Sequence, residues 1–241
     1  MKFLKTAIRK ILHDFGFDIR RYTPESSSFA QLLKGLEHFG VDMVLDVGAN
    51  AGQFASELRL SGFHGDIVSF EPLSTAHRVL LRASDGDSRW KVHERSAIGD
   101  FDGDIEIHLA GNSVSSSVLP MLDLHASAAV GSAYISSEKV AISKLDTIAA
   151  AYLEKASNPF LKIDTQGFEW QVLDGAVAIL PKFRGVLCEL SLAPLYENQR
   201  LWMDIIHRLE SVGFTLWALQ GGFVDPRDGR SLQMDGIFFR E

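Results

Sequence analysis

The sequence predicts an α/β domain built on a doubly wound, mostly parallel sheet, and three observations support this prediction. Short apolar segments alternate with amphipathic segments of helical period along most of the chain, as in repeated β–α units. A glycine-rich turn at residues 48–52 follows the first apolar segment. The 241 residues are 46% hydrophobic and 23% charged, which is typical of a globular protein rather than a disordered or fibrous one.

The helices and strands are predicted from the spacing of apolar residues and from the glycines that end helices. Residues 29–39 have helical spacing and end at Gly40, and residues 53–61 stop in the same way at Gly62. Further helices are expected over 74–84, 145–153, 168–180 and 199–211. Apolar runs predict strands over 41–47, 66–70, 90–98, 160–164, 186–189, 214–219 and 236–240.

Residues 104–110 interrupt this rhythm. They alternate between apolar and polar side chains with period two, which predicts an added strand. A segment rich in glycine, serine and alanine follows at 111–137, then a short strand at 139–142. The turn-rich stretch between the last two strands favours a hairpin.

The first 22 residues form a basic amphipathic segment. Six basic residues against two acidic ones give it a net charge of +4, and its apolar side chains recur at helical spacing. Two interpretations stay open: the helix rests on an anionic membrane surface, or it packs on the domain or on a second copy in a homo-oligomer. The segment lacks the apolar core and cleavage site of a signal peptide, and no apolar run is long enough to span a membrane.

Composition also excludes some function classes. The net charge of −7 argues against a nucleic-acid partner, because phosphate contacts need clustered cations. The single cysteine, Cys188, excludes an internal disulfide framework and a multi-cysteine metal site. A reducing compartment suits such a chain, so we expect a cytoplasmic protein, peripherally membrane-associated if its first helix binds lipid.

The glycine-rich turn indicates an adenosine-type cofactor. Gly48 and Gly52 have the spacing G-x-x-x-G with Asn50 between them, whereas a dinucleotide site prefers G-x-G-x-x-G. Glu71, nineteen residues after Gly52, is placed to accept hydrogen bonds from ribose hydroxyls. Asp46 just before the turn would repel a pyrophosphate but attract an ammonium group. These features favour S-adenosylmethionine over NAD.

Several motifs together resemble a known family. The sequence DVGANAG at 46–52, FEP at 70–72, SAIGD at 96–100 and FLKIDTQGFE at 160–169 resemble the FkbM family of class I O-methyltransferases. The resemblance spans about residues 41–240. It implies a Rossmann-like methyltransferase domain over 41–241, preceded by a helical extension over 1–40. The implied activity is methyl transfer from S-adenosylmethionine to a hydroxyl, commonly of a sugar or a polyketide-derived product.

The cofactor-binding residues that the loop and the resemblance predict lie on four segments. They are Asp46, Gly48, Asn50, Gly52, Phe70, Glu71, Pro72, Ser96, Ala97, Ile98 and Asp164. The polar segment at 112–116 is a second candidate for cofactor or sugar contacts, with simple solvation as the alternative.

Two acidic residues end neighbouring predicted strands, where ligands bind in open parallel sheets. Asp164 and Glu189 are therefore the candidate catalytic residues, either as a general base or as ligands of Mg²⁺. The alternative for Asp164 is capping of the following helix. Asp235 matches an aspartate of the family and is a third candidate catalytic residue, expected to face the acceptor, with a turn or solvent role as the alternative. Lys162, inside an apolar strand, is interpreted as one half of a structural ion pair.

Two other classes of function compete with the predicted methyltransferase activity. One is a NAD-type Rossmann oxidoreductase. The G-x-x-x-G spacing argues against it, because such enzymes prefer G-x-G-x-x-G. The other is a non-catalytic protein that binds S-adenosylmethionine or serves in an assembly. The expected partner of the enzyme is a small-molecule or glycan acceptor.

Overall fold

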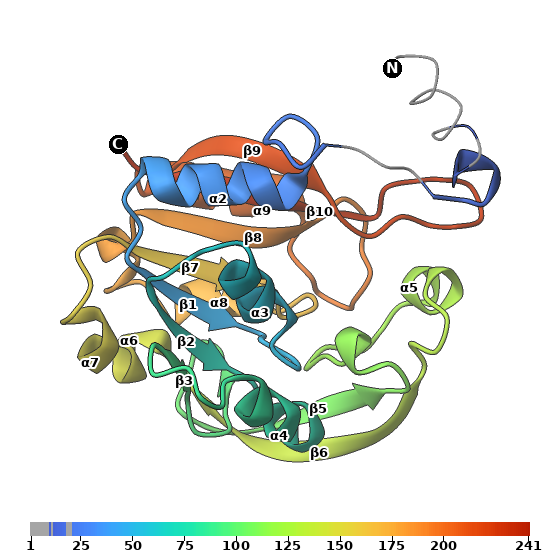
Figure 1. Cartoon of the computed structure of the whole chain (residues 1–241). Coiled ribbons are helices and arrows are strands. Elements are labelled where there is room, and N and C mark those ends of the chain that lie inside the picture. The colour runs from blue at the N-terminus through green and yellow to red at the C-terminus, as the bar shows by residue number, and fades with distance from the viewer. Residues whose placement is uncertain (1–9, 11, 18–20) are drawn as a thin grey trace.

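The computed structural model describes residues 10, 12–17 and 21–241. Most of the basic helix predicted over 1–22 lies outside these residues. The described chain forms a large twisted sheet with helices on both faces and a small second sheet beside it (Figure 1).

The large sheet has seven strands in the order β3-β2-β1-β7-β8-β10-β9. Strands β3, β2, β1, β7 and β8 are parallel to one another, and β10 runs antiparallel to both β8 and β9. The strands are β1 (Met43–Val47), β2 (Asp66–Phe70), β3 (Trp90–Val92), β7 (Pro159–Ile163), β8 (Gly185–Ser191), β9 (Thr215–Gly221) and β10 (Gln233–Phe239). The predicted doubly wound, mostly parallel sheet is confirmed.

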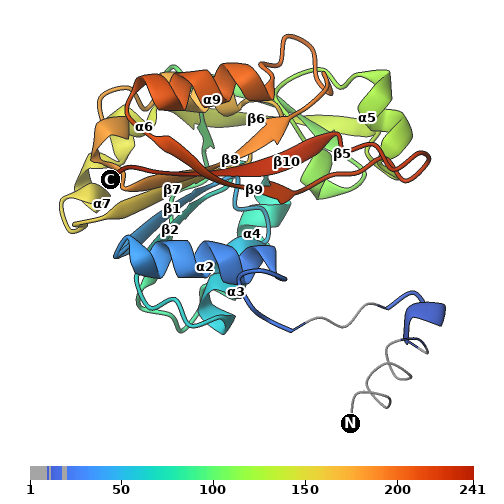
Figure 2. The same ribbon diagram turned by 90° about the horizontal axis from the view of Figure 1, so that it is seen from above.

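Two hydrophobic clusters hold the helices against the sheet. The first face is covered by α2 (Ser28–His38), α3 (Gln53–Leu60) and α4 (Ser74–Ala83). The opposite face is covered by α6 (Leu145–Ile148), α7 (Ala150–Leu153), α8 (Glu169–Asp174) and α9 (Trp202–Ser211). Figure 2 shows the two helical layers on opposite sides of the sheet. Burial of apolar side chains on both faces is the main stabilising contribution.

Helix α2 belongs to this core. Ser27 caps it by accepting a hydrogen bond from the backbone N–H of Ala30, and Leu32 and Leu36 pack against strand residues of the large sheet. Helix α2, which lies in the predicted 1–40 extension, is therefore packed on the domain. None of the helices in the described ranges is long and apolar enough to cross a membrane.

The small sheet contains β4 (Ala97–Ile98), β5 (Gly103–Ala110) and β6 (Tyr134–Ser143) in the order β4-β6-β5. The strand predicted over 90–98 is thus two strands in two sheets. The chain leaves the large sheet between them, since Glu94 and Arg95 are exposed and would not be accommodated between two packed layers. Strand β6 is longer than predicted because residues 134–138 pair with β5.

The segment between β5 and β6 contains a 3₁₀ turn, η1 (Ser113–Ser115), and helix α5 (Asp123–Ala128). The helix predicted over 168–180 ends at Asp174 and is followed by a separate turn, η2 (Leu180–Lys182). Gly175 lies at that end because a Cβ there would lie 1.8 Å from the carbonyl oxygen of Gly99. The end of α8 is therefore packed closely against the backbone that follows β4.

Candidate active site

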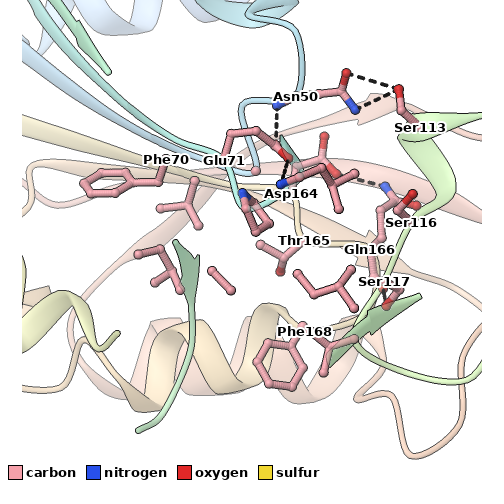
Figure 3. A pocket seen from close by; sticks show the side chains of 18 of the residues that line it. Asn50, Phe70, Glu71, Ser113, Ser116, Ser117, Asp164, Thr165, Gln166 and Phe168 are labelled. Carbon is pink, nitrogen blue, oxygen red and sulfur yellow. Dashed lines mark hydrogen bonds between the residues drawn. The ribbon is translucent and has the colours of Figure 1, made fainter. Parts of the chain in front are cut away.

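A cavity opens at the carboxyl ends of β1, β2 and β7, between the large and small sheets (Figure 3). It encloses about 740 Å³ of space, part of it open to solvent. Its lining includes Gly48, Asn50, Phe70, Glu71, Pro72, Ser96, Ala97, Ile98 and Asp164 among the predicted cofactor residues. Segments that are far apart in the sequence therefore meet where ligands bind in open α/β sheets.

The glycine-rich loop forms the first wall of this cavity. Gly48 has a φ of 77°, and its backbone N–H and that of Ala49 donate to the carbonyl oxygen of Phe70. A Cβ at Gly48 would lie 1.8 Å from the carbonyl oxygen of Asp164, so only glycine fits. Gly52, with a φ of 87°, packs against Leu80 and does not line the cavity.

Glu71 lies deep in the same wall and is 3% exposed. Its carboxylate accepts hydrogen bonds from the backbone N–H groups of Asn50 (2.8 Å) and Leu73 (2.7 Å), which fix it at the end of β2. Burial raises the pKa of Glu71 to about 7, although these hydrogen bonds lower it. Each oxygen keeps a further lone pair, so contact with a ribose hydroxyl stays a prediction that the geometry permits.

Asp46 lies apart from the cavity lining. It is fully buried, accepts a hydrogen bond from Ser69 Oγ and lies 3.1 Å from Lys162 Nζ. The ion pair expected for Lys162 is therefore confirmed. Burial lowers the pKa of Lys162, but the carboxylates of Asp46 and Asp164 outweigh burial and raise it above its ordinary value. Because Asp46 is neutralised in this way, its predicted contact with the cofactor stays a prediction.

The three candidate catalytic acids lie in one row across the sheet. Ile163 of β7 is paired with Cys188 of β8. The next residues along the two parallel strands, Asp164 and Glu189, therefore lie at the same level. Glu189 in turn is paired with Asp235. Burial raises the pKa of Asp235 to about 6, and the charge of Asp164 adds to this shift. Burial, Asp164, Glu169 and Asp235 together raise the pKa of Glu189 well above its ordinary value.

Gln166 connects two of these acids. Its Nε2 donates to Asp164 Oδ1 (2.9 Å) and to the carboxylate of Glu189 (3.2 and 3.4 Å). Tyr196 donates its hydroxyl hydrogen to Gln166 Oε1, and Ser117 Oγ donates to the Gln166 carbonyl. Gln166 has a φ of 53°, which this set of contacts holds in place.

The arrangement does not favour the predicted Mg²⁺ site. The amide nitrogen of Gln166 occupies the position between Asp164 and Glu189 that a shared cation would need. In the described ranges, no three His, Cys, Asp or Glu side chains are grouped so that they could hold a metal ion. The general-base interpretation of these acids stays a prediction.

The segment after β5 closes the outer side of the cavity. Asn50 Nδ2 lies 3.3 Å from Ser113 Oγ, and Ser113, Ser116 and Ser117 all line the space (Figure 3). Ser96 is 5% exposed, and its Oγ has no hydrogen-bond partner within the described chain. A buried hydroxyl without a partner costs free energy unless a ligand or water satisfies it.

The Methyltransferase FkbM domain matches residues 46–216 of this chain. The chain belongs to the FkbM methyltransferase family. Its resemblance to this family and its predicted class I methyltransferase fold are both confirmed. No curated protein matches the sequence at a significant level.

Several solved structures are also similar to this FkbM chain, at low sequence identity. The methyltransferase domain of bacterial CtHen1 is 10% identical, with 90% of this chain and 100% of that chain covered and a TM-score of 0.49. The Methanococcus jannaschii fibrillarin pre-rRNA processing protein is 12% identical, with 91% of this chain and 77% of that chain covered and a TM-score of 0.47. A TehB-like SAM-dependent methyltransferase from Corynebacterium glutamicum is 11% identical, with 89% and 97% covered and a TM-score of 0.39.

Sequence reasoning missed parts of the site in this FkbM protein. Glu169 is 4% exposed and accepts hydrogen bonds from the backbone N–H groups of Thr165 and Gly167. Burial raises its pKa to about 7. Its place in the motif beside Asp164 was the available signal. Tyr196 is 1% exposed, and its part in the site is the hydrogen bond from its hydroxyl to Gln166.

Proposed function

We propose that this FkbM protein transfers a methyl group from S-adenosylmethionine to a hydroxyl group of a neutral sugar or glycosylated acceptor. The observation that carries the proposal is the meeting of Glu71, Gly48 and Asp164 on one cavity. Glu71 offers a buried carboxylate to ribose hydroxyls, and Gly48 lets the backbone approach the ligand. Asp164 lies at the neighbouring strand end, where an acceptor hydroxyl would meet the cofactor.

The unpartnered hydroxyl of Ser96 supports an adenosyl ligand in this cavity. It lies next to Ala97 and Ile98 on the cavity wall, and its Oγ can donate to or accept from a nitrogen of adenine. Phe70 and Ile98 add apolar surface to the same wall. A cavity with apolar walls and a few placed polar groups is typical of small-molecule sites.

Bound S-adenosylmethionine supplies an activated methyl group on a sulfonium. The residues of the chain have to orient the acceptor oxygen and remove its proton as the O–C bond forms and the S–C bond breaks. Asp164 and Glu189 are the groups proposed for this proton, with Gln166 keeping both carboxylates in place. Burial and the neighbouring carboxylates raise the pKa of Glu189, and a carboxylate with a raised pKa is a stronger base than an ordinary one.

The polar lining supports an uncharged, hydroxyl-rich acceptor. Ser113, Ser116, Ser117 and Gln166 present hydroxyl and amide groups rather than cations. The nearby row of carboxylates disfavours a phosphate or carboxylate on the acceptor. Neutral sugars and polyols fit both conditions.

Calorimetric titration with S-adenosylmethionine, S-adenosylhomocysteine and NAD tests the cofactor. Binding of the two adenosyl compounds without NAD is expected. A panel of neutral and anionic sugars with labelled S-adenosylmethionine then tests the acceptor, with Asp164→Asn as the control. We expect this variant to bind S-adenosylhomocysteine but to lose turnover. Binding of NAD alone would contradict the proposal, and adenosyl binding with full turnover in Asp164→Asn would refute the role of that residue.

A further inference from the structure

Lys162 makes more contacts than an ion pair with Asp46 requires. Its Nζ lies 3.1 Å from Asp46 Oδ1 and 2.9 Å from the carbonyl oxygen of Gly48. The same nitrogen lies 3.4 Å from the Val47 carbonyl oxygen and 3.7 Å from Asp164 Oδ2. An ammonium group has three N–H donors, so it can serve the buried acid and the glycine-rich loop at the same time.

The groups that Lys162 joins belong to two parts of the site. Gly48 belongs to the cofactor loop and Asp164 to the proposed acceptor side, and both line the cavity. They also touch directly, since a Cβ on Gly48 would collide with the Asp164 carbonyl oxygen. The ammonium group of Lys162 thus lies at the junction of two segments that are more than a hundred residues apart in the sequence.

The side chain of Lys162 is itself firmly placed. It is 5% exposed, and its Nζ lies 5.7 Å from the centre of the Phe54 ring of α3. Asp46, its partner, accepts from Ser69 Oγ, which in turn accepts from Trp90 Nε1. The ammonium group therefore has a fixed position from which to hold the loop.

We propose that Lys162 is a positioning residue whose ammonium group holds the glycine-rich loop and Asp164 in the arrangement that binds the adenosyl cofactor. This inference rests on the proposed function. The competing explanation is that Lys162 only neutralises Asp46. The two explanations differ in what happens when the ion pair is replaced by neutral side chains of similar size, because such replacement removes the buried charges without leaving either one unpaired.

The test is a set of three variants, examined by thermal unfolding and by titration with S-adenosylhomocysteine. Lys162→Met leaves Asp46 buried without its cation and is expected to lose stability. The double variant Asp46→Asn/Lys162→Met is expected to regain the lost stability. Its affinity for S-adenosylhomocysteine is expected to stay about tenfold weaker than that of the wild type, which is the loss expected for one charge-assisted hydrogen bond. Amide exchange at residues 48–50 is expected to stay faster.

Asp46→Asn alone keeps Lys162 and its contact with Gly48. We expect this variant to bind S-adenosylhomocysteine more tightly than the double variant does, whatever Asp46 itself contributes to the affinity. The exposed ion pair between Asp104 and Lys139 offers a matched control, and Asp104→Asn/Lys139→Met is expected to leave the affinity unchanged.

Two outcomes overturn the inference while leaving the proposed function intact. One is a stable double variant that binds S-adenosylhomocysteine as tightly as the wild type does. The other is an Asp46→Asn variant whose affinity falls as far as that of the double variant. If the wild type itself does not bind S-adenosylhomocysteine, the proposed function fails together with the inference.

Discussion

The hydroxyl of Tyr196 donates to Gln166 Oε1 over 3.0 Å, and this contact fixes which end of the Gln166 amide faces the acids. Nε2 then points to Asp164 and Glu189 and donates to both. Burial and the nearby carboxylates raise the pKa of Tyr196 far above its ordinary value, so its hydroxyl stays protonated as a donor. The chain of contacts thus runs from a buried phenol to two carboxylates.

Gln166→Glu is expected to destabilise the protein more at pH 8 than at pH 5.5. The change removes the N–H donors to Asp164 and Glu189 and adds a carboxylate next to them, and protonation at low pH relieves the repulsion. At pH 8 we expect a loss of about 2 kcal/mol in the free energy of unfolding. Chemical denaturation at the two pH values measures it.

Gln31→Glu on α2 is the matched control for that substitution. Gln31 Oε1 accepts a hydrogen bond from Gln220, and a glutamate keeps this acceptor. The free energy of unfolding of Gln31→Glu should equal that of the wild type at both pH values. An unchanged stability of Gln166→Glu at pH 8 would show that the donors of Gln166 contribute little.

Gly48→Ala is expected to abolish binding of S-adenosylhomocysteine and to destabilise the fold by about 3 kcal/mol or more. The added Cβ would lie 1.8 Å from a backbone oxygen of Asp164, and the φ of 77° is unfavourable for alanine. Gly221→Ala is the control, because no atom lies within 4 Å of a Cβ placed there. Calorimetry and thermal unfolding of both variants test this, and normal binding by Gly48→Ala would contradict it.

The stability of the ligand-free protein is expected to fall as the pH rises from about 4.5, where a glutamate of the unfolded chain titrates, to about 7. In the folded state the pKa of Glu71 and that of Glu169 are about 7, above the ordinary value for glutamate. The folded state therefore holds protons in this window that the unfolded state has released, so raising the pH favours unfolding. His93 and His125, whose pKa values are lowered by burial, act in the opposite direction in the part of this window that lies below about pH 6.5.

The loss from Glu71 is expected to be on the order of 1–3 kcal/mol. Unfolding curves of the wild type and of Glu71→Gln across this pH range measure it, because the variant cannot titrate at that position. Its stability should depend less on pH than that of the wild type. Parallel curves for the two proteins would mean that Glu71 ionises in the folded state as an ordinary glutamate does.

Chelation with EDTA is expected to leave both S-adenosylhomocysteine affinity and methyl transfer unchanged. The reason is that Gln166 Nε2, rather than an oxygen, faces both Asp164 and Glu189. Activity with and without EDTA, using the acceptor found in the sugar panel, measures this. Loss of activity that added Mg²⁺ restores would return these acids to the role of metal ligands.

The sequence was sufficient to locate most elements of the large sheet and the cofactor loop. Strand β2 lies where it was predicted, and Gly48, Glu71 and Asp164 meet on one cavity as expected. Local patterns carry this information because buried parallel strands are apolar runs and the ligand edge follows from their direction. The split of residues 90–98 into two sheets was not predictable, since it depends on the pairing of β4 with the distant β6.

The sequence by itself determined the fold class, the family motifs and the acidic residues at the strand ends. Tertiary structure alone decided what each acid faces. Asp46 is neutralised by Lys162, while Asp164 shares the amide of Gln166 with Glu189. The physical reason is that the charge state and reach of a buried acid depend on atoms within a few ångströms, and these come from segments far apart in the chain.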